Sequence, residues 1–130
     1  GVQTCALPIF AAQKRGQFIA TSSVAGLKNY PGAGVYGGTK WFVRNLMEVL
    51  RMESALEGTN IRTATISPAA IDTELLGGIT HGASAEAMSA LYQRYGISPE
   101  RIAQVVSFAI DQPGDTNVSE FTVGPTAQPW

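Results

Sequence analysis

The order of the strand-like and helix-like segments predicts an α/β fold, with three parallel strands in one sheet and helices between them. Three short segments rich in apolar and β-branched residues lie at positions 17–22, 61–67 and 118–123, and helical patterns separate them. Strands joined by a helix lie parallel, and the crossover between them is nearly always right-handed. Of the 130 residues, 45% are hydrophobic and 15% are charged, which is typical of one compact domain.

The first residues look foreign to this pattern. Residues 1–9, GVQTCALPI, resemble the translation of a sequencing-library adapter, so we expect the native domain to comprise residues 10–130. The alternative is that they are native residues at the end of a helix. Residues 11–15 are predicted to form the last turn of a helix, with Gly16 just beyond it.

Local composition marks the first strand, a loop and a long helix. The segment 17–22 contains the continuous apolar run Phe-Ile-Ala, which suits a parallel strand covered on both faces. A Pro-Gly pair within residues 24–35 indicates a turn. From Tyr36 to about Leu56, apolar residues recur at three- and four-residue steps, and Gly58 ends this helical pattern.

The remaining segments follow the same alternation. Residues 61–67 are rich in β-branched side chains, which favour a strand. Residues 74–95 are predicted to hold one or two helices. A further helix is expected to begin with Ser98 as its N-cap and Pro99 in its first turn, and the Pro-Gly pair at positions 113–114 is expected to stop it.

Three residues in this arrangement can carry acid–base chemistry. Tyr36 and Lys40 are four residues apart and share one face of the long helix. A nearby cation lowers the pKa of a phenol from its usual value of about 10, which makes the phenol usable as an acid or base nearer neutral pH. Ser23 follows the first strand, so its hydroxyl is expected to join them at the C-terminal edge of the sheet.

A tyrosine and a lysine at this spacing would alone mark an ordinary helix surface. Here they follow a strand, a serine thirteen residues before the tyrosine and a glycine-containing loop, and a second strand comes after them. This combination resembles the short-chain dehydrogenase/reductase family over residues 16–130. The resemblance implies an NAD(P)-dependent oxidoreductase that acts on an alcohol/carbonyl pair. It also implies a doubly wound, Rossmann-like sheet, of which this chain is expected to be the C-terminal half.

The resemblance assigns a role to each of the three residues. Tyr36 would pass a proton to or from the substrate oxygen, and Ser23 would hold that oxygen by a hydrogen bond. Lys40 would support the phenolate of Tyr36 and bond the nicotinamide ribose, so Tyr36 and Lys40 are also expected to lie against the cofactor. Tyr30, in the loop before the tyrosine, is expected to border the substrate.

The loop after the second strand is the expected nicotinamide contact. The family has a Pro-Gly pair there, and this sequence has Pro68 and Ala69. By the same resemblance, Ile71 would contact the carboxamide through its backbone and Thr73 through its hydroxyl. If the position of Ala69 requires a positive φ, alanine is strained there, whereas a negative φ would cost nothing.

The part of such a fold that binds the cofactor phosphates is not found in this sequence. It requires a glycine-rich turn between a strand and a helix. Gly32, Gly34 and the Gly-Gly pairs at 37–38 and 77–78 follow the wrong element or have the wrong spacing. The family's asparagine, well before the serine, also has no counterpart. We therefore expect an N-terminally truncated fragment that is inactive alone, whose cofactor in the intact enzyme is NAD or NADP.

Charge and composition limit the partners. A formal net charge of −1 provides no field that would attract nucleic acid or an anionic membrane. No apolar run reaches the roughly 20 residues of a membrane span, and the start lacks the basic region of a signal peptide, so a cytoplasmic location is expected. His81 has no second ligand candidate at metal spacing, and Cys5 is the single cysteine, so neither a metal site nor a disulfide is predicted.

The expected partner is a small-molecule alcohol or carbonyl substrate. The family resemblance further implies a homo-oligomer formed through the helix at residues 36–56. The alternative function is a non-catalytic chain that acts only as a partner module through the same helix.

Overall fold

The computed structural model describes residues 2–79 and 82–129. Its centre is a sheet of three parallel strands in the order β1-β2-β3. In chain order the elements are α1 (Val2–Gln13), β1 (Gly16–Thr21), the 3₁₀ helix η1 (Val24–Gly26), α2 (Gly34–Glu57), β2 (Ile61–Pro68), the 3₁₀ helix η2 (Glu74–Gly78), α3 (Gly82–Tyr95), α4 (Glu100–Ile110) and β3 (Glu120–Val123). The predicted α/β fold with three parallel strands is confirmed.

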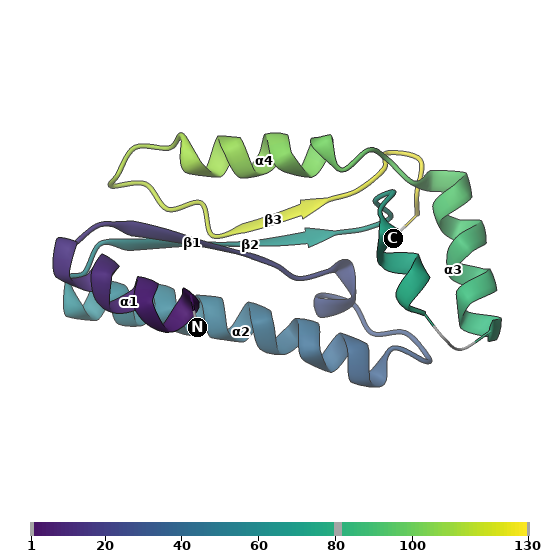
Figure 1. The fold of residues 1–130 in the computed structure, drawn as a ribbon, viewed down its shortest axis with the longest axis horizontal. Helices are drawn as coiled ribbons and strands as arrows, with labels where there is room; N and C mark the ends of the chain where they lie inside the picture. The colour runs from purple at the N-terminus through teal and green to yellow at the C-terminus, as the bar shows by residue number, and fades with distance from the viewer. Residues whose placement is uncertain (1, 80–81, 130) are drawn as a thin grey trace.

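Different helices cover the two faces of the sheet. α1 and α2 lie on one face and α4 lies on the other, as Figure 1 shows. η1, the start of α2, η2 and α3 gather at the end toward which the strands run. Ligands of open α/β sheets bind at this carboxyl edge. The segments that follow β1 and β2 are therefore the place to look for function.

The central strand β2 supplies much of the core. It pairs with β1 on one side and with β3 on the other. Ala64 and Ile66 are completely buried, and Thr63 and Thr65 are 2% and 3% exposed. Both faces of the strand are covered, so the hydroxyl-bearing side chains of Thr63, Thr65 and Ser67 are buried along with the apolar ones. Burying a side chain such as Ile66 contributes about 1.5–3 kcal/mol.

The end of α1 differs from the sequence expectation. The helix ends at Gln13, and Lys14 takes the left-handed conformation with φ 49°. The Arg15 amide then donates to the Phe10 carbonyl and the Lys14 amide to the Ala11 carbonyl, each at 3.2 Å, which is the Schellman pattern of a helix C-terminus. The expectation of a last turn at residues 11–15 was therefore wrong by two residues.

Gly16 has a packing role instead of a capping role. It is the first residue of β1, and a Cβ atom there would lie 2.2 Å from Phe10 Cγ. The missing side chain lets the Phe10 ring approach the strand, where it packs on Phe18 with ring centroids 5.1 Å apart. α1 runs without a break across the boundary between residues 9 and 10. The adapter origin of residues 1–9 stays a prediction.

The end of α2 agrees with its prediction. Gly58 has φ 63° and its amide donates to the Ser54 carbonyl, so the expected glycine stop is confirmed. The buried Ser54 hydroxyl accepts from the Ile61 amide at 2.8 Å and joins the helix to the first residue of β2. The helix begins at Gly34, two residues before the predicted start.

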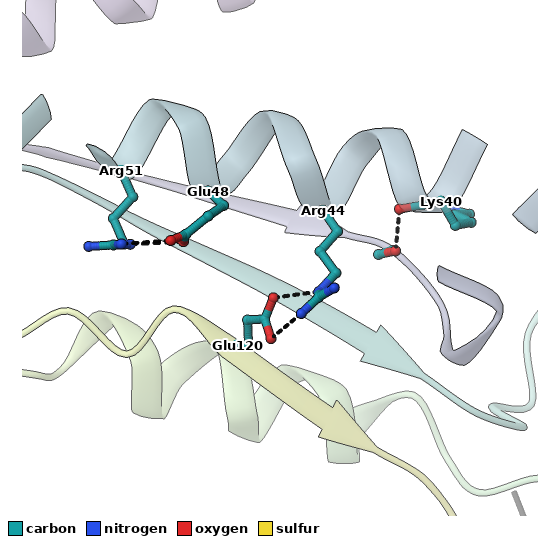
Figure 2. Close-up of polar contacts among 6 residues, drawn as sticks. Lys40, Arg44, Glu48, Arg51 and Glu120 are labelled. Carbon is teal, nitrogen blue, oxygen red and sulfur yellow. Dashed lines mark hydrogen bonds and ion pairs between the residues drawn. The ribbon is translucent and has the colours of Figure 1, made fainter. Parts of the chain in front are cut away.

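An ion pair joins α2 to β3 across the sheet surface. Arg44 meets both carboxylate oxygens of Glu120, at 2.6 and 3.2 Å, as Figure 2 shows. The hydrogen bond that Arg44 donates to Glu120 raises the pKa of Arg44. Because the two side chains are 34% and 45% exposed, the pair contributes at most about 1 kcal/mol. Its two-point geometry matters more, since it orients the helix over the strand.

α4 is capped at both ends. The N-cap position is Pro99, one residue after the predicted Ser98, although the Ser98 hydroxyl still accepts from the Glu100 amide at 3.3 Å. Arg62 of β2 donates to the Ile110 carbonyl at 3.1 Å and to the Gln112 carbonyl at 2.7 Å. The helix thus ends before the Pro-Gly pair expected to stop it, and a side chain from the sheet binds its final carbonyl groups.

The remaining elements fall within their predicted segments. Residues 74–95 contain η2 and α3, in agreement with the expected one or two helices. β3 begins at Glu120 rather than at position 118. Among the helices of residues 2–79 and 82–129, none has the length and apolar character that crossing a bilayer requires.

The isolated 130-residue chain is expected to be marginally stable. Within the described residues β1 pairs with β2 alone, so the backbone groups on its other edge lack strand partners. Phe42 and Leu46 on α2 are 64% and 51% exposed. We expect aggregation, or a molten species that binds ANS and lacks sharp near-UV circular dichroism. A monomer with a cooperative thermal transition above roughly 60 °C would contradict this expectation.

Candidate active site

Ser23 lies where β1 passes into η1, at the carboxyl edge of the sheet. Its backbone is extended, with φ −166° and ψ 162°, and it is the N-cap of η1. The Ser23 hydroxyl oxygen accepts from the Ala25 amide at 3.2 Å. Because a hydroxyl has one hydrogen to donate and two lone pairs, this bond leaves the Ser23 hydrogen available. The group can therefore donate to an oxygen atom of a ligand.

Tyr36 and Lys40 stand together in the first turns of α2. The Lys40 ammonium nitrogen lies 5.6 Å from the centre of the Tyr36 ring. The same nitrogen donates to the Thr21 carbonyl at the end of β1, at 3.4 Å. Tyr36 is 43% exposed, so a ligand can reach it. The structure thus brings together the phenol and the cation that the sequence placed on one helix face.

Small residues hold the start of α2 close to the turn that follows Ser23. A Cβ atom on Gly37 would lie 3.2 Å from the Ala25 carbonyl oxygen. A Cβ atom on Gly26 would lie 3.0 Å from both the carbonyl carbon and the carbonyl oxygen of Lys40. The two backbones therefore approach more closely than larger residues would allow. Ser23 and Tyr36 come from elements that are in direct contact.

The charge of Tyr36 acts on two further tyrosines, Tyr30 and Tyr92. Burial raises the pKa of Tyr30, and the charge of Tyr36 raises it further. Burial likewise raises the pKa of Tyr92, with smaller contributions from the charges of Tyr36 and Tyr30. Both phenols therefore stay protonated at neutral pH and can donate hydrogen bonds. Tyr30 was expected in this region from its place in the sequence, whereas Tyr92, which lies on α3 far along the chain, was assigned no role at the site.

Two hydrogen bonds join the loop after β2 to the C-terminal segment of the chain. The Ala69 amide donates to the Val123 carbonyl at 2.9 Å, and the Ala70 amide donates to Gln128 Oε1 at 3.0 Å. Pro68 is the last residue of β2, and Ala69 and Ala70 are buried. These contacts tie the predicted nicotinamide loop to the C-terminal segment.

Ala69 carries no left-handed strain. Within residues 2–79 and 82–129, the non-glycine residues with positive φ are Lys14 and Asn60. Of the two alternatives for this position, the structure therefore has the one in which alanine replaces glycine without a backbone penalty.

Ile71 and Thr73 can both present polar groups. Ile71 forms a parallel bridge with Ile97. The Ile97 amide donates to the Ala70 carbonyl at 3.2 Å, and the Asp72 amide donates to the Ile97 carbonyl at 2.9 Å. In such a bridge the Ile71 amide and carbonyl point to the opposite side. The Thr73 hydroxyl oxygen accepts from the Leu75 amide at 3.4 Å, so its hydrogen remains available.

Residues 2–79 and 82–129 contain no group of three or more His, Cys, Asp or Glu side chains arranged to hold a metal ion. His81 lies outside the described residues.

A surface hollow of about 390 Å³ runs along α2 and β3. It is lined by Trp41, Arg44, Asn45, Glu48, Ser119 and Glu120, none of which is a predicted site residue.

Comparison with known proteins shows the family to which the chain belongs. The sequence profile of the short chain dehydrogenases matches residues 2–84. The chain belongs to the short-chain dehydrogenase family. An uncharacterized oxidoreductase of Listeria monocytogenes is 69% identical over 95% of the chain and 50% of the relative. A probable NADP-dependent dehydrogenase of Haemophilus influenzae is 37% identical over 94% of the chain and 48% of the relative.

Solved short-chain dehydrogenases share the fold. The closed form of serine dehydrogenase, complexed with NADP+, superposes with a TM-score of 0.85 and 28% identity, covering 98% of this chain and 51% of that chain. The predicted Rossmann-like architecture and the family resemblance are confirmed. The chain spans about half the length of the curated relatives it matches.

Replacing Gly26 with alanine is expected to loosen the contact between η1 and α2. The added Cβ atom would lie 2.6 Å from Ser22 Oγ and 3.0 Å from the Lys40 peptide, so the full-length protein should lose about 1–3 kcal/mol of unfolding free energy. Gly38→Ala is the matched control, because that helical position opens to solvent and alanine should stabilise it by about 0.5–1 kcal/mol. Urea unfolding of both variants measures the difference, and equal effects would show that the close approach is unimportant.

Proposed function

We propose that the protein containing this chain is an NAD(P)-dependent oxidoreductase that interconverts an alcohol and a carbonyl compound. The observation that supports this most directly is the Lys40 ammonium, 5.6 Å from the Tyr36 ring centre, in a helix packed against the turn after Ser23. Membership of the short-chain dehydrogenase family supports the same reaction class. It does not favour the alternative of a non-catalytic partner module.

The chain's own residues divide the work at the substrate oxygen. Tyr36 gives its phenolic proton to that oxygen in carbonyl reduction and removes it in alcohol oxidation. Ser23 donates a hydrogen bond to the same oxygen, which stabilises negative charge as it develops. Lys40 places a positive charge beside the phenolate form of Tyr36. The neutral phenols of Tyr30 and Tyr92 border the site and suit a small polar alcohol or carbonyl compound.

The loop after β2 fits one side of a nicotinamide. When bound, the cofactor supplies or accepts the hydride. Ile71 presents a backbone donor and acceptor, Thr73 presents a hydroxyl, and Pro68 and Ala69 add little bulk. Tyr36 and Lys40 would complete the cofactor contacts, and the Lys40 ammonium would donate to the ribose hydroxyls of a bound cofactor. The residues present therefore suit NAD or NADP at this edge of the sheet.

Substitution of Tyr36 tests the proposed chemistry. In the full-length protein, Tyr36→Phe removes the proton donor and should lower kcat/KM by about 10²–10⁴-fold. Tyr95→Phe, which removes the same oxygen atom from another tyrosine on α3, should change kcat/KM less than about threefold by comparison. Steady-state rates with NADH and NADPH over a panel of small carbonyl compounds measure both. Comparable losses in the two variants would reject Tyr36 as the acid–base group.

The isolated chain is expected to bind neither NAD nor NADP measurably. Its sequence contains no glycine-rich turn between a strand and a helix to receive the pyrophosphate. A longer reading frame of the gene should encode that turn, and the protein made from it should bind the cofactor in the same titration calorimetry experiment. Saturable cofactor binding by the 130-residue chain would show that the truncation was misread.

We also propose that the full-length protein forms a homo-oligomer through α2. An exposed apolar stripe follows a seven-residue repeat on this helix: Val35, Phe42, Leu46, Val49 and Leu56, which are 40–86% exposed. Such a repeat suits packing against a second helix, and an exposed stripe of this length favours an interface.

A charge placed in the stripe tests the oligomer. Leu46→Glu should convert the full-length protein to a smaller species in light scattering after size exclusion, because the carboxylate would be buried in the contact. Ala55→Glu adds the same charge on another side of α2 and should leave the mass unchanged. If both variants keep the mass of the unsubstituted protein, α2 does not form the interface.

A further inference from the structure

Two consecutive residues at the end of β1 hold Lys40 at two points. The Thr21 carbonyl accepts from the Lys40 ammonium at 3.4 Å. The Ser22 hydroxyl donates to the Lys40 backbone carbonyl at 2.9 Å, the contact drawn at Lys40 in Figure 2. Ser23 follows directly. The end of β1, which carries the proposed substrate-binding residue Ser23, therefore also bonds to Lys40, the residue that supports the proton donor Tyr36.

Ser22 is itself rigidly placed. It is 3% exposed, and its amide donates to the Ile66 carbonyl at 2.7 Å, which extends the ladder between β1 and β2. Gly26 leaves room for the hydroxyl, since a Cβ atom there would lie 2.6 Å from Ser22 Oγ. The Lys40 carbonyl belongs to α2, so a bond to it fixes the first turns of that helix relative to the sheet.

We propose that Ser22 is a positioning residue: its hydroxyl sets the place of the Lys40 ammonium and the Tyr36 phenol relative to Ser23. This inference rests on the proposed oxidoreductase function and concerns the same site. Ser22 contacts no substrate in this role. It acts by holding α2, and a catalytic group that shifts by about 1 Å can lose 10²-fold in rate.

A second buried serine on α2 separates positioning from stability. Ser54, near the other end of the helix, accepts from the Ile61 amide at 2.8 Å and is 5% exposed. Ser54→Ala leaves that buried amide without its partner, so it should destabilise the protein at least as much as Ser22→Ala does. The bond of Ser54 lies at the opposite end of β2 from the site, so its loss should leave the catalytic geometry intact.

The experiment compares Ser22→Ala and Ser54→Ala in the full-length protein. For each variant, kcat and KM are measured for the panel carbonyl compound that the unsubstituted protein reduces fastest, and the concentration of active protein is determined from cofactor binding. If Ser22→Ala does not fold, Ser22→Cys, which keeps a weak donor, replaces it.

Ser22→Ala is expected to lower kcat per active molecule by about 10- to 100-fold, with KM changed less than about twofold. Loss of kcat without loss of substrate binding is the expected sign of a displaced proton donor. Ser54→Ala should leave both kcat per active molecule and KM within about twofold of the unsubstituted protein. An unchanged kcat in Ser22→Ala, with an active unsubstituted protein, rejects the positioning role alone. An unsubstituted protein that turns over no compound rejects the proposed function and this inference with it.

Discussion

The close approach between the turn after β1 and the first turns of α2 governs the arrangement of this molecule. Gly26 and Gly37 remove the side chains that would separate the two backbones, and the Ser22 hydroxyl bonds to the Lys40 carbonyl across the gap. Gly26 meets the Lys40 carbonyl group and Gly37 meets the Ala25 carbonyl oxygen, and side-chain rotation cannot move these backbone atoms away. The distance between a strand end and a helix start is thus set by residues that take no part in the proposed chemistry.

The parallel sheet explains why the predicted site residues gather at one end. In a parallel sheet every strand delivers its following loop to the same edge. β1 delivers Ser23 there, and β2 delivers the loop from Pro68 to Thr73. The bridge between Ile71 and Ile97 then keeps that loop extended, with its free backbone groups turned to one side. The long α2 returns the chain to the start of β2 and leaves Tyr36 at the site.

The surfaces that remain uncovered are consistent with a chain about half as long as its relatives. β1 has an open edge within the described residues, and α2 exposes a seven-residue apolar repeat. Other surfaces are closed by polar contacts, as where Arg44 meets Glu120 and where Arg62 binds the end of α4. The open edge of β1 and the apolar repeat of α2 are therefore the surfaces that the full-length protein or a second copy would cover.

The sequence alone determined those features that depend on neighbours along the chain. The glycine stop of α2 at Gly58, the capping by Ser98 and the common helix face of Tyr36 and Lys40 follow from local periodicity and backbone preference. The order of strands and helices also follows, because each element carries its own pattern. Tertiary structure decided the rest. Nothing in the sequence indicates that Ser22 bonds to Lys40 or that the charge of Tyr36 acts on Tyr92, because these interactions join residues brought together only by packing. The same holds at the end of α1. There Gly16 leaves room for the Phe10 ring against the strand, and Lys14 takes the left-handed conformation that ends the helix.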